Sequence, residues 1–206
     1  MVVCRTLFSL AASVILLASC MGSLGSSAPP RYFEVDYSPH TPPCAGSAAT
    51  GSVRVWPFSA SPPFDREEMI VLDSSHRVRL SPQYRWITNP GAMTADRLLR
   101  DLAKSSLFTG AVNSQSPFDT DLELGGHVFR FAWEEKDGSS RAVLDVEVSL
   151  WRDKLEPDIL FRRQYHFASR PFEEGSPEGL AEAMGDLMRQ LSSQVMEDLC
   201  AMPQKK

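Results

Sequence analysis

Apolar and polar residues alternate along residues 121–170, which is the pattern of β-strands that bury one face. The clearest strand has an apolar residue at every second position: Ala142, Leu144, Val146, Val148 and Leu150. An Asp-Gly turn at Lys136-Asp137-Gly138-Ser139 joins it to a preceding strand, and Ile159–Ala168 forms a third. The preceding strand carries Phe129, Phe131 and Trp133. We expect Gly125-Gly126 to mark a bulge in it, and we expect helices to cover the apolar face of this meander.

Two amphipathic helices are predicted to provide that cover. The C-terminal helix has Ser176 as its N-cap and Pro177 at its first position. Its apolar stripe consists of Leu180, Met184, Leu187, Leu191, Val195 and Leu199. The earlier helix is predicted to begin after Thr94, as N-cap, and to end before Gly110. Four of its charged residues are expected to face water: Arg97, Arg100, Asp101 and Lys104.

Shorter strands are predicted in the first half of the body. They are Arg31–Tyr37, the segment beginning at Ser52, Glu68–Leu72 and Arg77–Leu80. In the second of them, Val53 and Val55 are expected to be buried and Arg54 to be exposed. Three aromatic residues of the proline-rich segment that follows are candidates for exposed contacts: Trp56, Phe58 and Phe64. The pattern as a whole predicts an α+β domain with an antiparallel or mixed sheet and two principal helices on one face.

The N-terminus has the layout of a secretory signal. One charge at Arg5 precedes the apolar run Leu7–Ala18, which is shorter than the roughly 20 residues of a membrane span. The run ends in Leu17-Ala18-Ser19-Cys20, which resembles a bacterial lipobox. We therefore expect Cys20 to be lipidated and to become the new N-terminus. The alternative is an ordinary secretory signal with an incidental cysteine.

This interpretation divides the chain into a signal peptide at residues 1–19, a lipidated flexible tether at 20–30 and a periplasmic α+β domain at 31–206. The tether is rich in Gly, Ser and Pro, so it cannot bury enough apolar surface to fold. Several acyl chains would hold the protein stably on a membrane. Met21, where inner-membrane lipoproteins of Gram-negative bacteria carry Asp, indicates the outer membrane.

Charge and cysteine content agree with export. The formal net charge of -5 argues against a nucleic-acid surface, which needs clustered Lys and Arg. Cys4 would leave with the signal and Cys20 would carry lipid, so Cys44 and Cys200 remain. In an oxidising periplasm these two could form a disulfide, although sequence alone does not place them within bonding distance.

Nothing in the sequence predicts catalysis, a metal site or a cofactor. The histidines His40, His76, His127 and His166 are scattered, and no two have ligand spacing. Motifs of hydrolases, nucleotide-binding proteins and dehydrogenases are missing. Glu134 and Glu135 are neighbours on a strand and point to opposite faces, so they cannot act as an acid pair.

The segment "YRWITNPGAMTADRLLRDLAKSSLFTGAV" resembles the ABC-type transport auxiliary lipoprotein family, which includes the lipoprotein of the paraquat-inducible operon. The matching positions are Tyr84, Trp86, Pro90, Leu98, Leu102, Leu107, Phe108 and Val112. The order of parts is also similar: lipobox, early strand, this segment, long hairpin and C-terminal helix. The chain departs from the family at Ile87-Thr88-Asn89-Pro90, where paired prolines are common, and in the loop around Cys44.

The resemblance implies an accessory protein of an MCE-type ABC lipid transport system. Its partners would be an MCE-domain protein and ABC transporter subunits, and its membrane contact would be the N-terminal acyl anchor. A ring of identical subunits would match a symmetric MCE tunnel, so a homo-oligomer stays open. Two other functions also stay open: a lipid-binding lipoprotein, and an assembly factor for outer-membrane protein or lipopolysaccharide. Tyr84 and Trp86 are expected to pack in the core rather than to contact a partner.

Overall fold

The computed structural model describes residues 28–39, 51–75, 77–136, 138–152, 158–173 and 175–202. These form one mixed sheet of nine strands and two helices, which confirms the predicted α+β class. The strands are β1 Arg31–Phe33, β2 Ser52–Val55, β3 Ser59–Ala60, β4 Glu68–Asp73, β5 Val78–Trp86, β6 Gly110–Asn113, β7 Leu122–Lys136, β8 Ser139–Arg152 and β9 Asp158–Ala168. The helices are α2 Pro90–Lys104 and α3 Pro177–Cys200.

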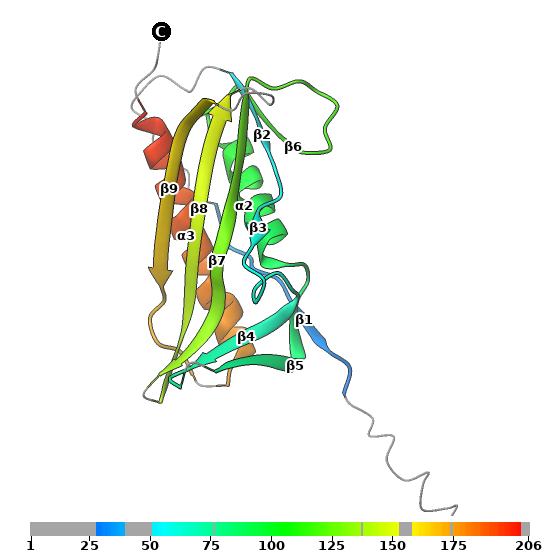
Figure 1. Ribbon diagram of the computed structural model, residues 1–206, viewed down its shortest axis with the longest axis vertical. Coiled ribbons are helices and arrows are strands. Elements are labelled where there is room, and N and C mark those ends of the chain that lie inside the picture. Colours follow the sequence, from blue (N-terminus) through cyan, green and yellow to red (C-terminus); the bar gives the residue numbers. More distant parts are fainter. Residues whose placement is uncertain are drawn as a thin grey trace, which may run out of the picture.

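The long strand β7 organises the sheet (Figure 1). One edge of β7 pairs antiparallel with β8, and β8 pairs antiparallel with β9, as the alternation predicts. The other edge pairs in turn with three short parallel strands, β2, β3 and β4. Strand β6 then pairs with β2, while β5 and β1 extend the sheet from β4. The sheet therefore has β2 and β6 near one end of β7, and β4, β5 and β1 near the other (Figure 1).

Both helices pack on one face of the sheet, where the principal core lies (Figure 1). Helix α3 lies against β8 and β9, and α2 lies against β6, β7 and α3. All six predicted stripe residues of α3 are buried, as are the alternating residues of β8. Trp86 meets Phe131 edge-on in this core, with ring centroids 5.2 Å apart. The Ser176 hydroxyl caps α3 as predicted, since it accepts a hydrogen bond from the Gly179 N–H at 2.9 Å.

The first helix begins earlier than predicted. Asn89, not Thr94, is its N-cap, and the Asn89 side chain accepts a hydrogen bond from the Ala92 N–H at 2.8 Å. Pro90 occupies the first helical position, where its missing N–H costs nothing. Thr94 lies inside the helix, and its hydroxyl donates to the Pro90 carbonyl at 2.7 Å. The Asn-Pro pair is the stronger start signal, and Thr94 is a buried residue of the first turns.

The expectation that Asp101 faces water is wrong. Asp101 is fully buried and accepts hydrogen bonds from the Tyr37 hydroxyl at 2.7 Å and from Arg100 Nε at 2.9 Å. Burial, and then the bond to Asp101, raise the pKa of Tyr37 well above its ordinary value. The Arg97 side chain is also largely covered, because its Nε donates to the Val35 carbonyl at 2.8 Å.

These contacts explain why the predicted strand Arg31–Tyr37 ends at Phe33. From Glu34 to Tyr37, which we call the 34–37 segment, the backbone leaves the sheet and lies between the two helices. Val35 is fully buried there. A Cβ on Gly185 of α3 would stand 2.6 Å from the Asp36 carbonyl oxygen, so α3 needs glycine at this crossing.

The predicted bulge at Gly125-Gly126 is also misplaced. Both glycines pair in regular register with β8, and the register shifts between Val128 and Arg130. The shift leaves the Phe129 side chain 38% exposed. The two glycines serve packing instead, because a Cβ on Gly126 would overlap the Phe58 ring and a β8 carbonyl.

Of the three aromatic residues proposed for exposed contacts, only Trp56 is exposed. Phe58 is buried over Gly126 in the principal core. Phe64 is buried in a second, small cluster on the opposite face of the sheet, with Ile70, Ala132 and Val143. The segment stays close to the sheet, because β3 pairs with β7 directly after Phe58 and the Phe64 N–H donates to the Ser61 carbonyl at 2.7 Å in the turn that follows.

Candidate interaction surface

A buried ion pair lies on the face of the sheet opposite the helices. Arg54 on β2 is only 5% exposed, contrary to the sequence-based expectation, and its neighbour Glu123 on β7 is 2% exposed. Arg54 Nε lies 3.7 Å from Glu123 Oε2. Burying two charges is unfavourable unless each gains further hydrogen bonds. The surrounding residues provide those bonds.

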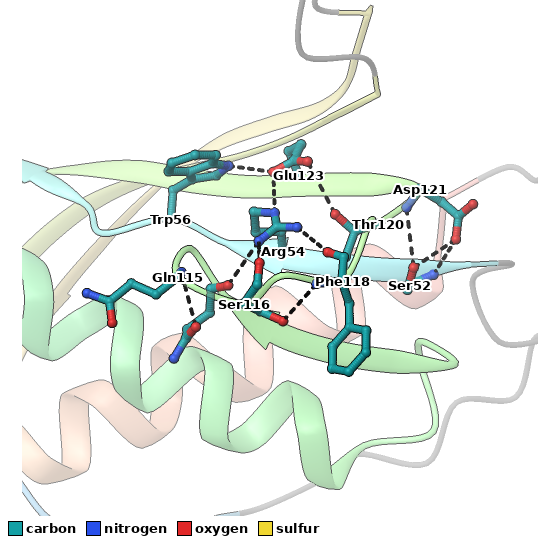
Figure 2. Close-up of polar contacts among 10 residues, drawn as sticks. Ser52, Arg54, Trp56, Gln115, Ser116, Phe118, Thr120, Asp121 and Glu123 are labelled. Carbon is teal, nitrogen blue, oxygen red and sulfur yellow. Dashed lines mark hydrogen bonds and ion pairs between the residues drawn. The ribbon is translucent and has the colours of Figure 1, made fainter.

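The guanidinium of Arg54 holds the connection between β6 and β7. It donates from Nη1 to the carbonyl oxygens of Asn113 at 3.3 Å and Ser116 at 2.9 Å, and from Nη2 to that of Phe118 (Figure 2). The connection has to cross β2, which lies between β6 and β7 in the sheet. Arg54 therefore fixes the crossing loop against the strand beneath it.

The carboxylate of Glu123 is satisfied by two other donors. Trp56 Nε1 donates to Glu123 Oε2 at 2.5 Å, and the Thr120 hydroxyl donates to Oε1 at 3.2 Å. Figure 2 shows Trp56 on one side of this cluster and Asp121 on the other. Asp121 accepts bonds from the Ser52 N–H at 2.7 Å and hydroxyl at 2.9 Å. The backbone bond from Ser52, then the hydroxyl bond, lower the pKa of Asp121.

Apolar side chains that are exposed or half-buried lie around this cluster on the same face. We define the apolar row as Phe118, Trp56, Trp151 and Ile159. Trp151 pairs with Glu123 on one side and with Ile159 on the other, so these residues share one line across β7, β8 and β9. Phe118 is 70% exposed, Ile159 48% and Trp56 39%.

The two tryptophans of the row are held in place by the residues beneath them. Gly125 leaves room for the Trp151 ring, whose nearest atom would be 3.0 Å from a Cβ there. Trp56 is fixed through Glu123, and the backbone at Phe118 is fixed through Arg54. Large apolar side chains whose conformations are set before binding are typical anchors of protein interfaces. The arrangement can bind an apolar surface, but it offers no acid, base or nucleophile aimed at a substrate.

Polar groups elsewhere on this face do not form a catalytic set. His127 lies between the hydroxyls of Ser59, 2.7 Å from Nδ1, and Ser61, 3.0 Å from Nε2. Both ring nitrogens therefore contact hydroxyls, and neither is oriented by a carboxylate as in a hydrolase triad. Within the described ranges, no three His, Cys, Asp or Glu side chains gather as metal ligands. His40 and His76 lie outside the described residues.

The positions that carry the family resemblance belong to the core and not to the row. Trp86 is buried and Tyr84 is half-buried, as expected for core packing. The others lie in and around α2: Pro90 starts the helix, Leu98 and Leu102 are on its buried face, Leu107 and Phe108 are buried in the turn after it, and Val112 is half-buried on β6. These residues define the fold of this segment.

Cys20 and Cys44 lie outside the described residues, as do residues 1–27 of the predicted leader and tether. Cys200, the last residue of α3, is disulfide-bonded. Its pairing with Cys44 stays a prediction. In the part of the chain that is described, neither helix combines the length and the apolar character that a bilayer crossing requires.

The sequence-based interpretation missed Arg54, Glu123 and Trp151. The alternation around Arg54 gave no sign of its burial, because Arg54 is covered only where the connection between β6 and β7 crosses β2. The acidic Asp119–Asp121 region that follows the crossing gave no indication of which carboxylate would meet this arginine.

Comparisons with known proteins give a family and a fold. The model of a family described as "ABC-type transport auxiliary lipoprotein component" matches residues 36–196. Protein XCC0632 from Xanthomonas campestris is 17% identical, with a TM-score of 0.67 over 81% of this chain and 91% of its own. A structure described only as an uncharacterized protein is 13% identical, with a TM-score of 0.61 over 84% and 99%. At these identities the two structures show the fold alone. No curated protein matches.

Proposed function

The chain belongs to the family of ABC-type transport auxiliary lipoprotein components, and from this premise we propose that it is the accessory protein of an MCE-type ABC lipid transport system. It would be anchored by lipid at Cys20, face the periplasm and dock the transport complex at the outer membrane. The observation that carries the proposal is the family match over residues 36–196. In this role the chain performs no chemistry, and ATP hydrolysis belongs to the transporter subunits.

The strand at which the chain enters the body, β1, and the apolar row lie at opposite ends of the sheet. The tether leads into β1, which extends the sheet beside β5 and β4. Strand β4 pairs with β7 at Glu134, eleven positions after Glu123, which pairs with Trp151 of the row. At about 3.3 Å per residue, the two ends are separated by roughly 36 Å. A partner arriving from the periplasm would therefore meet the row first, which supports the row as the docking surface for the transport complex.

The lipid-carrier alternative has less support. A hollow of about 220 Å³ lies between α2 and β2, lined by Val55, Pro57, Ala92, Ala95, Asp96, Leu99, Asn113, Ser114 and Gln115. Pockets for small molecules usually enclose about 300–1,000 Å³ and are mostly apolar. This hollow is smaller and has polar residues on one side, so it does not suit an acyl chain. An envelope assembly factor remains the other alternative.

The test is to purify the natively lipidated protein, with a C-terminal tag, from gently solubilised envelopes of its host and to identify co-purifying proteins by mass spectrometry. We expect an MCE-domain protein and its ABC subunits. Both should be lost with Cys20→Ala. Recovery of bound lipid alone, or of outer-membrane assembly proteins, would replace the proposal with one of the alternatives.

A second pair of variants tests the docking surface. Phe118→Ser and Ile159→Ser change exposed side chains, so the protein should keep its thermal stability and its acyl chains. We expect the combined variant to lose the MCE-domain protein. Phe129→Ser, at an exposed apolar residue in the middle of β7, is the matched control and should retain it. Equal recovery of the MCE-domain protein with the unchanged protein, the combined variant and the control would contradict docking through the row.

A further inference from the structure

A second group of exposed apolar side chains lies at the end of the sheet where the chain enters the fold. We define the tether-end patch as Tyr32, Val78, Leu80 and Ile87. Their side chains are 56%, 51%, 46% and 57% exposed, respectively. Tyr32 lies on β1, Val78 and Leu80 on β5, and Ile87 directly after β5, and Figure 1 places these strands together at one end.

The patch is on the sheet face that the helices leave uncovered. Val78 and Leu80 pair with Leu72 and Ile70 of β4, whose side chains belong to the small cluster on that face. Farther along β5, Trp86 points into the helix-covered core, so its neighbours Arg85 and Ile87 point the other way. Tyr32 pairs with Arg85 and so shares its face.

The charges around the patch are balanced. Each of four arginines there has a carboxylate partner: Arg31 with Glu178 at 2.5 Å, Arg77 with Asp73 at 2.9 Å, Arg79 with Glu135, and Arg85 with Glu68 at 3.4 Å. The patch therefore presents apolar side chains with little net charge. Such a surface does not suit an anionic ligand, but it can enter the boundary between lipid headgroups and acyl chains.

The position of the lipid anchor decides what the patch meets. Arg31, the first residue of β1, is eleven positions after Cys20. A fully extended chain of that length spans at most about 36–40 Å. Because the tether leads directly to β1, it brings this end of the body closest to the bilayer.

We propose that the tether-end patch lies against the phospholipid surface and sets the orientation of the anchored domain. The proposal rests on the lipid anchor of the proposed function. Tyr32 suits the interfacial region, because its ring can enter the lipid while its hydroxyl stays hydrated. Since the arginines are neutralised by their partners, the contact should not require anionic lipid, unlike a polybasic segment.

The experiment uses the full lipidated protein on phosphatidylcholine vesicles. An environment-sensitive dye is attached at Leu80→Cys, and in a second protein at Phe118→Cys in the apolar row. We expect a blue-shifted emission for the dye at residue 80 and the emission of a water-exposed dye at residue 118. Adding anionic lipid should leave both spectra unchanged. Equal emission at the two sites, or a blue shift at 118 alone, would overturn the proposal.

A further variant separates contact from mere nearness to the membrane. In this variant the dye is attached at Ile87→Cys, and Val78→Ser and Leu80→Ser are added together. The two serines should abolish the blue shift if the apolar side chains hold the patch on the lipid. An unchanged blue shift would contradict that role. Intact mass measurement distinguishes the two levels of proposal. A protein without acyl chains at Cys20 refutes the anchor, whereas an acylated protein whose residue 80 stays water-exposed refutes the patch alone.

Discussion

Replacing Arg54 with methionine tests the argument for the buried ion pair. Met replaces the apolar stem of Arg but lacks the guanidinium, so Arg54→Met leaves the carboxylate of Glu123 buried without its cation. Removing one member of a buried pair usually costs about 3–5 kcal/mol of unfolding free energy. Trp56 and Thr120 still donate to Glu123, so we expect the lower value, about 3 kcal/mol. For a domain of this size that lowers the melting temperature by roughly 6–12 °C.

The assay is urea unfolding and thermal melting of the purified protein, followed by near-ultraviolet circular dichroism. Arg162→Met is the matched control, because the Arg162 side chain is 55% exposed and its ion pair with Glu147 is 3.6 Å long. This control should change the unfolding free energy by less than about 0.5 kcal/mol. The double variant Arg54→Met with Glu123→Gln should lose less unfolding free energy than the two single variants together, since it has no buried charge without a partner. An Arg54→Met loss below about 1 kcal/mol, or strict additivity, would refute the reasoning.

Three further outcomes follow from the structure. Gly126→Ala should destabilise the protein far more than Gly125→Ala in the same melting assay. The methyl group added at residue 126 would overlap the Glu147 carbonyl and the Phe58 ring, whereas the one added at residue 125 would only touch the edge of the Trp151 indole. Non-reducing peptide mapping should find Cys44 linked to Cys200, and a link from Cys200 to any other cysteine would refute the pairing. Carboxyl NMR should show Asp121 titrating below the usual value of about 3.9, because its two hydrogen bonds lower its pKa. The contribution of Asp121 to stability is then complete above about pH 4 and is lost as the pH falls through the lowered pKa. A titration midpoint of Asp121 at the usual value would contradict the prediction.

The periodic parts of the sequence predicted the fold well. Strands β7, β8 and β9, the hairpin between the first two, and the cap and stripe of α3 all lie where alternation and helical spacing indicate. In these elements the regular spacing of apolar residues identifies the buried face, because every second residue of a strand, or every third or fourth residue of a helix, lies on the same side.

The failures occurred where a distant segment decides the environment. Asp101 is on the polar side of α2 by sequence spacing, but Tyr37, 64 positions earlier, covers it. Arg54 is on the outer side of β2, but the crossing loop between β6 and β7 covers it. No local pattern predicts such cover, so the ion pair and the apolar row above it could not be derived from the sequence.

The 34–37 segment has a mechanical consequence for an anchored protein. In the proposed role, a pull between the membrane and a docked partner would enter the domain at Arg31 and run along β1. The pull then loads the hydrogen bonds between β1 and β5 together, in shear, instead of opening them one at a time. Behind that strand, Val35 is enclosed between the helices, and Arg97 and Asp101 hold the backbone and the ring of Tyr37. A force on the N-terminus would thus be resisted by contacts with both helices, and β1 would not be the only element holding the chain in the domain.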